Sequence, residues 1–242
     1  MKLFVCGDTH GLHDIGKLDY FAKTGGKDLT KDDYVVQLGD WGGFWGTPGG
    51  EREQSIVNRY YAYPWTTLVV DGNHDNHVRL QAMKQIDMFG GKVSEIVENV
   101  YYLRRGHVFN LGGKKIFVMG GGYSIDKDWR VPGESWWHQE IPSDEEFEFA
   151  LSNLKVIDYK PDYVFTHSPP RSIIDMLSRD EMTMKLTPNL EWKAKLEDGC
   201  SVGLQRIYDQ IEFKEWHCGH MHIDLELEKF HLHYNYPPHQ VF

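Results

Sequence analysis

The feature that most constrains this chain is a short apolar run followed directly by polar side chains, a pattern that occurs four times. The runs cover residues 3–6, 34–38, 67–70 and 163–166, and each stops at Gly, Asp or His. Their length and composition are those of buried strands. Because segments with helical spacing lie between them, we expect an α/β fold whose strands end at one edge of a sheet. Polar residues gathered at such an edge predict a functional site there.

Two of the intervening segments have the spacing of helices that bury one face. In residues 15–21 the apolar side chains recur at helical intervals, and residues 147–154 do the same. Ser143 and Glu146 precede the second segment with the spacing of a capping box, which predicts a helix start at this point.

The middle and the end of the chain are richer in strands. Gly112 and Gly113 separate two apolar runs and predict a β-hairpin. Residues 223–227 alternate apolar and acidic side chains, as in a half-buried strand, and we expect residues 231–236 to pair with them. Two packed sheets covered by helices accommodate both halves of the chain.

Oxygen and nitrogen donors cluster directly after five apolar runs. The clusters are Gly7–Gly11, Gly39–Asp40, Gly72–Asp75, His167 and Gly219–His222. A donor set without thiolate favours an open site for manganese, iron or zinc over a closed structural zinc site. We assign Cys6 and Cys218, which neighbour these clusters, to packing. Seven further histidines are assigned mostly to the surface or to packing. Of these, His107 and His138 are the two that we consider able to reach the site; the other five are His13, His77, His231, His233 and His239.

The order Asp-x-His, Gly-Asp, Gly-Asn-His-Asp, His and Gly-His-x-His spans residues 8–222 and resembles the calcineurin-like metallophosphoesterase family, in particular its uncharacterised bacterial or phage members. The resemblance implies a four-layer α-β-β-α sandwich, with two mixed β-sheets flanked by helices and a binuclear metal site at the C-terminal tips of the strands. It implies two divalent ions, with Mn²⁺ preferred and Fe, Zn or Ni as alternatives. One ion would be held by Asp8, His10, Asp40 and His222, and the other by Asp40, Asn73, His167 and His220.

The resemblance also implies a reaction. A hydroxide shared by the two ions would attack phosphorus. His74 would protonate the leaving oxygen or stabilise the transition state, which is worth about 10²- to 10⁴-fold. Asp75 would orient the His74 ring, or it would cap the following helix.

Departures from the sequence patterns of known subfamilies narrow the range of expected substrates. Gly43 and Phe44 stand where phosphoprotein phosphatases have an Asp-Arg pair, and Asp71 stands in place of an upstream Arg, so protein phosphatase activity is disfavoured. A phosphodiesterase or nuclease acting on nucleotides or single strands is the alternative to a phosphomonoesterase. A metal-binding scaffold without activity is the third hypothesis.

Residues 123–142 lack periodicity and are interpreted as a cap or inserted loop, which in compact domains is usually functional. Arg130 in this loop is a candidate phosphate clamp, in competition with three other arginines. Trp41, directly after Asp40, is a candidate ring for stacking on substrate, with core packing as the alternative. The competing arginines are Arg104, Arg105 and Arg171.

The composition limits the partners. Lys and Arg number 26 against 36 Asp and Glu, a formal charge of −10 without a basic stripe, which argues against duplex nucleic acid. We expect a small phosphorylated substrate or a nucleotide as the partner, and no membrane, because no run approaches the ~20 apolar residues of a span. Three unpaired cysteines and the absence of a leader pattern predict a cytoplasmic protein. Residues 1–242 are expected to form a single domain. The sequence predicts no particular oligomeric state.

Overall fold

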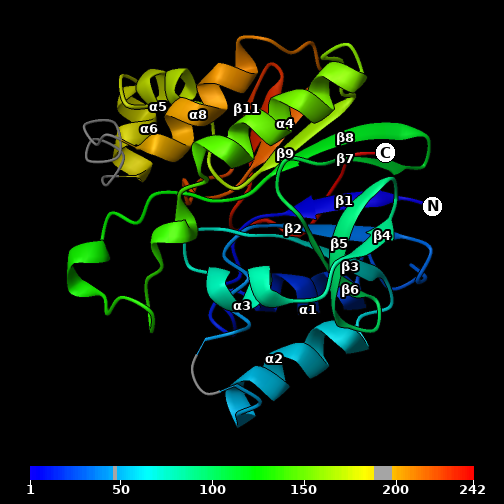
Figure 1. Ribbon diagram of the computed structural model, residues 1–242. Helices are drawn as coiled ribbons and strands as arrows, with labels where there is room; N and C mark the ends of the chain where they lie inside the picture. The colour runs from blue at the N-terminus through cyan, green and yellow to red at the C-terminus, as the bar shows by residue number, and fades with distance from the viewer. Residues whose placement is uncertain (46–47, 188–197) are drawn as a thin grey trace.

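Two β-sheets face each other in the computed structural model, which describes residues 1–45, 48–187 and 198–242. Figure 1 shows helices on the outer side of each sheet. The first sheet is mixed, with parallel central strands and antiparallel edges. Its order is β13 (His239–Gln240), β1 (Leu3–Cys6), β2 (Tyr34–Leu38), β3 (Thr66–Val70), β6 (Val100–Leu103), β5 (Gly91–Val97) and β4 (Ile86–Met88).

The second sheet is also mixed, and it has six strands. Its order is β11 (Leu225–Leu227), β12 (Phe230–Leu232), β10 (Glu215–Cys218), β9 (Tyr163–Thr166), β8 (Lys114–Met119) and β7 (Val108–Leu111). The expected hairpin around Gly112 is confirmed as β7 and β8. In the C-terminal region only residues 230–232 pair with β11, so the expected partner strand is shorter than residues 231–236.

Helices form the two outer layers (Figure 1). The first sheet is covered by α1 (Gly16–Lys23), α2 (Glu51–Ala62) and α3 (His77–Ala82). The second is covered by α4 (Asp144–Val156), α5 (Arg171–Leu177), α6 (Glu181–Leu186) and α8 (Gly199–Tyr208). The capping box predicted at the start of α4 is present, because Ser143 and Glu146 each accept from the other's backbone N–H. The four-layer sandwich expected from the sequence is thereby confirmed.

Strand alternation divides the apolar side chains among three cores. In β1, Leu3 and Val5 face the second sheet, whereas Phe4 and Cys6 face the helices. The layer between the sheets is filled by Val, Leu, Ile and Phe side chains that are fully buried. Burial on both faces fixes the register of the strands, since a slip by one residue would exchange the two faces. Rigid strands therefore deliver their C-terminal tips to defined positions.

The segment between β8 and α4 contains two short 3₁₀ helices, η1 (Lys127–Trp129) and η2 (His138–Glu140). In Figure 1 this green segment extends away from the sheets. It includes the residues 123–142 that the sequence marked as a cap or loop. Among the described residues, no helix is long and apolar enough to cross a bilayer.

Candidate metal centre

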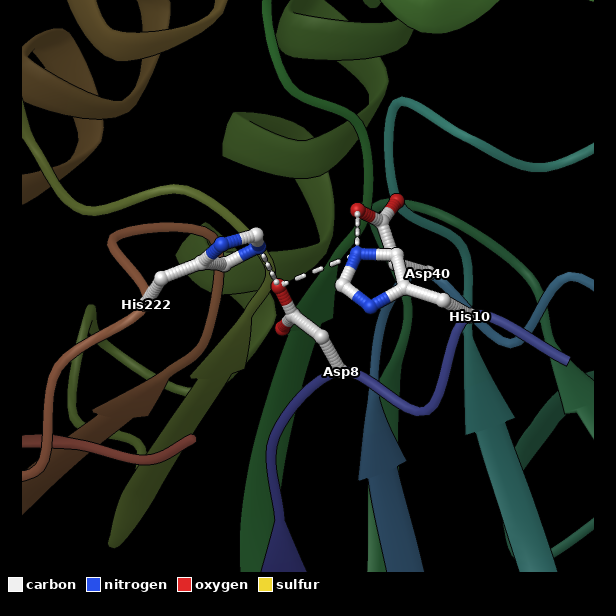
Figure 2. Close-up of side chains that lie close together, drawn as sticks. All are labelled: Asp8, His10, Asp40 and His222. Atoms are coloured by element: carbon white, nitrogen blue, oxygen red, sulfur yellow. Dashed lines mark ion pairs between the residues drawn. The ribbon is translucent and has the colours of Figure 1, made fainter. Parts of the chain in front are cut away.

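One group of four predicted ligands meets where β1, β2 and β10 end (Figure 2). The Nε2 atom of His10 lies 3.4 Å from Asp40 Oδ2 and 3.9 Å from Asp8 Oδ2. The Nε2 atom of His222 lies 3.0 Å from Asp8 Oδ2. One donor atom from each residue lies within 4.8 Å of the others. Donors that share an ion with bonds of about 2.0–2.2 Å lie roughly 3–3.5 Å apart, so small side-chain shifts would close the group around a cation.

A second group adjoins the first through Asp40. The Nε2 atom of His167 lies 3.4 Å from Asp40 Oδ1 and 2.9 Å from Asn73 Oδ1. The ring of His220 is centred 4.9 Å from the ring of His167. Asp40 therefore turns one carboxylate oxygen toward each group, which is the geometry that a bridging ligand requires.

Neighbouring groups orient these ligands. Nδ1 of His10 is 2.7 Å from Asp14 Oδ2, and Nδ1 of His167 is 2.8 Å from the Leu38 carbonyl oxygen. Such partners fix the ring and leave Nε2 for a metal. Buried Asp8 Oδ2 has His222 Nε2 at 3.0 Å as an ion-pair partner, but the geometry between them is not that of a hydrogen bond. A buried carboxylate oxygen without a well-formed hydrogen bond, beside imidazoles held in this way, fits a cation at this point.

The backbone is strained where it presents the ligands. His10, Asp40, His220 and His222 have φ values of 46°, 50°, 63° and 53°. Non-glycine residues in this region cost about 1–3 kcal/mol each and cluster at functional sites. Gly219 is required by close packing, since a Cβ atom there would lie 2.3 Å from Asp8 Oδ1.

Opposite charges shift the titration of the metal-free ligands. Burial acts to raise the pKa of Asp8, but His167 and His222 outweigh it and lower the pKa to about 2. Burial acts to lower the pKa of His167, but Asp40 and Asp8 raise it to about 9. A negative cluster that holds extra protons on imidazole exchanges them for a divalent cation, because metal binding releases protons from its ligands.

A cavity of about 460 Å³ opens onto the first ligand group. The lining comprises His10, His13, Asp14, Gly42, Trp45, Arg52, His74, Arg130, His222 and Tyr234. His74 lies between the ligands and the cap, since its backbone N–H donates to Asp40 Oδ1 at 2.7 Å and its Nε2 is 3.5 Å from Arg130 Nη2. Burial, joined by the Arg130 charge and opposed by Asp40, lowers the pKa of His74. Its ring is therefore neutral at pH 7 in the metal-free protein.

Arg130 is the predicted clamp that the structure places in this cavity. Its guanidinium pairs with Asp126 at 2.6 and 2.8 Å and lies 5.3 Å from the centre of the Trp45 ring. Arg104 and Arg105 instead line a separate cavity of about 580 Å³, together with His107 and His138. The idea that these two histidines reach the metal centre is therefore not supported.

Trp41 does not have the position predicted for a substrate-stacking ring. It is only 1% exposed and packs edge-on against Phe44 and Tyr60, with centroids 5.0 and 5.9 Å away. The chain turns back after Asp40 into the layer beneath the first sheet, which buries the ring. Trp45, four residues later, lines the cavity instead.

Asp75 also has a role different from the two that the sequence predicted. Its carboxylate accepts from the backbone N–H groups of Gly42 and Gly72, both at 2.7 Å. His74 Nδ1 has no hydrogen-bond partner among the described residues, and Asn76 rather than Asp75 caps α3. Burial and the nearby Asp40 raise the pKa of Asp75 to about 7. Asp75 thus ties the loop that carries Asp40 to the loop that carries Asn73.

Three functional candidates escaped the sequence reasoning. Arg52 lines the cavity from the first turn of α2. Ser124 and Glu140 in the cap hold a ligand: Asn73 Nδ2 donates to Ser124 Oγ at 3.1 Å, and Ser124 Oγ donates to Glu140 Oε2 at 2.5 Å. Glu140 is 1% exposed. No motif marks these residues, and the only available signal, for Ser124 and Glu140, was their place in a long irregular segment.

Comparison with known proteins identifies the family of this chain. The model of the calcineurin-like phosphoesterases matches residues 1–224. The chain belongs to this family. A lariat debranching enzyme of Schizosaccharomyces pombe is 26% identical over 162 residues, which are 66% of this chain but only 33% of that enzyme. A crystal structure of a protein of unknown function from Aquifex aeolicus covers 99% of this chain and 95% of its own, at 15% identity and a TM-score of 0.38.

Family membership bears on the broad chemistry expected of this chain. It supports metal-dependent hydrolysis of phosphoester bonds, and members of the family generally bind two divalent metal ions. The ligand group of Asp8, His10, Asp40 and His222 supplies a candidate site for this metal.

Proposed function

We propose that this calcineurin-like phosphoesterase hydrolyses phosphodiester bonds in nucleotides or single strands, at a binuclear centre bridged by Asp40. The observation that carries the proposal is the Asp40 carboxylate, with one oxygen facing each ligand group beneath a cavity that also holds His74 and Arg130. The proposed ligands are those that the sequence predicted: Asp8, His10, Asp40, Asn73, His167, His220 and His222. Manganese is the proposed ion, with iron, zinc and nickel as alternatives.

The charge of the cavity favours a diester over a monoester. Arg130 is already paired with Asp126, and the lining contains Asp14 beside Arg52. A phosphomonoester carries close to two negative charges at pH 7, whereas a diester carries one. Arg52, together with Arg130 whose positive charge is partly neutralised by Asp126, matches the single negative charge of a diester. Trp45 adds an aromatic surface in the same cavity, on which a base can stack.

Two bound divalent ions would supply Lewis-acid polarisation of the phosphoryl group and an activated water. The protein's own residues would orient the substrate and the catalytic imidazole. Arg130 and Arg52 would hold the non-bridging phosphate oxygens in the cavity. His74, neutral and fixed through its backbone to Asp40, would direct a ring N–H at the leaving oxygen. Trp45 donates its indole N–H to the His74 carbonyl oxygen at 2.5 Å, which steadies the loop that carries the imidazole.

A panel of substrates tests the proposal. With Mn²⁺, we expect kcat/KM for bis(p-nitrophenyl) phosphate to exceed that for p-nitrophenyl phosphate at least about 10-fold. His74→Ala should lower kcat by about 10²-fold or more, whereas His107→Ala, outside the centre, should not change it. A monoester preference would remove the diesterase assignment. A protein with two bound ions and no turnover of any ester, nucleotide or single strand would instead support the scaffold hypothesis.

A further inference from the structure

A cluster of histidines lies inside the sandwich, outside the ligand groups of the phosphoesterase centre. His217 on β10 and His231 on β12 are register partners in parallel strands, and their rings stack with centroids 4.7 Å apart. His233 and His239 lie next to them, with centroids 5.3 and 5.9 Å from that of His217. Glu215 completes the cluster, with Oε2 3.2 Å from His217 Nε2.

The direction of these side chains follows from strand alternation. Trp216 and Cys218, the neighbours of His217, pack into the core beneath the helices, as do Phe230 and Leu232 on either side of His231. The two histidines therefore point to the opposite face, toward the first sheet. His217 contacts Phe165 of the inter-sheet core edge-on, at 5.6 Å.

The first sheet contributes to the same cluster from the other side. His239 on the edge strand β13 is the register partner of Val5, whose side chain belongs to the inter-sheet core. Directly opposite residues of an antiparallel pair lie on one face, so His239 also faces the second sheet. Elsewhere the buried part of this layer consists of Val, Leu, Ile and Phe with one Tyr. Imidazoles in such a layer lose hydration, and this loss must be offset by specific partners.

Hydrogen bonding within the cluster offsets only part of that loss. Nδ1 of His217 is 3.0 Å from His233 Nε2, and Nε2 of His217 faces Glu215. Neither ring nitrogen of His231 has a hydrogen-bond partner among the described residues, although both are buried. Each of Glu215, His217 and His231 offers one donor atom within 4.8 Å of the others. The group therefore contains one carboxylate and two imidazoles, and its His231 ring has no hydrogen-bond partner among the described residues.

We propose that Glu215, His217 and His231 bind a divalent transition metal ion of the zinc class at a site separate from the phosphoesterase centre. Imidazole and carboxylate suit zinc, and two histidines with one glutamate are a known ligand combination for it. The hydrogen bond between His217 Nδ1 and His233 is the type of partner that fixes a ligating imidazole. Glu215 keeps 38% of its side chain exposed and provides access from solvent.

The protonation of the cluster is compatible with metal binding. Burial lowers the pKa of His217 to about 4, and burial likewise lowers the pKa of His231. The hydrogen bond from His217 lowers the pKa of Glu215. At neutral pH the imidazoles are therefore neutral and the carboxylate is ionised, which are the forms that coordinate a metal.

The test counts zinc ions after equilibrium dialysis of the whole protein against a buffer of about micromolar free Zn²⁺, with zinc measured by mass spectrometry. Asp40→Asn removes the bridging ligand of the catalytic centre and isolates the new site. We expect this variant to retain one ion. Addition of Glu215→Gln or of His231→Gln should eliminate that ion, whereas addition of His107→Gln should not.

Folding of each variant is checked by circular dichroism in EDTA. Because Glu215 is half-exposed, its variant decides the outcome if His231→Gln fails to fold. Zinc retained in full by Asp40→Asn/Glu215→Gln, or no zinc bound by Asp40→Asn, would overturn the proposal. A wild-type protein that is inactive while the cluster still binds zinc would refute the phosphoesterase proposal alone, so the two can fail independently.

Discussion

Arg105→Met is expected to destabilise the protein strongly, because it leaves a buried carboxylate without its cation. The side chains of Arg105 and Asp71 are 3% and 0% exposed, and Arg105 Nε donates to Asp71 Oδ2 at 2.8 Å. After the substitution Asp71 would keep the Tyr102 hydroxyl at 3.0 Å and His77 Nδ1 at 3.4 Å. In the wild-type protein burial lowers the pKa of His77, the Arg105 charge adds to this and Asp71 opposes it.

Removal of one partner of a buried ion pair costs about 3–5 kcal/mol. In a chain of this size each kcal/mol shifts the melting temperature by about 2–4 °C, so the expected decrease is roughly 6–20 °C. Thermal and urea unfolding of the metal-free protein at pH 7 measure it. Arg206→Met is the matched control, since Arg206 is 44% exposed and its pairs with Glu148 and Asp144 should contribute about 1 kcal/mol or less.

A decrease no larger than that of Arg206→Met would refute the reasoning. The double variant Asp71→Asn/Arg105→Met separates charge from packing, because it removes the uncompensated carboxylate as well. We expect it to be more stable than Arg105→Met alone. If the two unfold alike, the loss arises from the Arg105 contacts with Gln139 and Glu146 and not from Asp71.

Three further outcomes are expected. Glu140→Gln should raise the Mn²⁺ concentration needed for half-maximal activity about 10- to 100-fold, because Glu140 holds Ser124 against Asn73, whereas exposed Glu134→Gln should not. Gly219→Ala should abolish Mn²⁺ retention at the phosphoesterase centre, since its Cβ would lie 2.3 Å from Asp8 Oδ1, whereas Gly16→Ala, with open space around it, should not; equal Mn²⁺ contents of the two variants would contradict this. In EDTA, the contribution of His217 to the unfolding free energy should fall by up to about 3 kcal/mol as the pH drops from 6.5 to 4, because only the unfolded chain protonates His217, whose pKa is lowered to about 4. His217→Gln should flatten this pH dependence in urea titrations, and an unchanged slope would contradict the assignment.

The positions of the proposed ligands can be predicted from the sequence because they depend on local information. A strand end followed by Gly-Asp or Gly-His places the donor at a sheet edge, wherever the strand lies in the sheet. Parallel pairing of β1 with β2 brings Asp8 and Asp40 together, and parallel pairing of β9 with β10 brings His167 beside His220. The packing of the two sheets against each other then joins the two pairs. The positive φ angles of His10 and Asp40 carry no sequence signal other than the neighbouring glycines.

The cavity was harder to predict because its walls depend on where irregular segments turn. Trp41 and Trp45 are equivalent in type and nearly adjacent in sequence, yet one lies in the core and the other in the cavity. Arg52 reaches the cavity only because α2 begins at Glu51. Ser124 and Glu140 contact each other across sixteen residues of a segment without periodicity.

The contacts of the cap bear on how substrate choice is separated from metal binding. Glu140 and Ser124 support Asn73, so part of the cap belongs to the metal centre and cannot change freely. Arg130 lies on the same segment but contacts Asp126, Trp45 and His74, all on the side of the cavity. Substitutions at Arg130 should therefore alter KM for different esters while leaving the metal requirement unchanged. Substitutions at Glu140 should do the opposite, so one segment carries both functions on distinct residues.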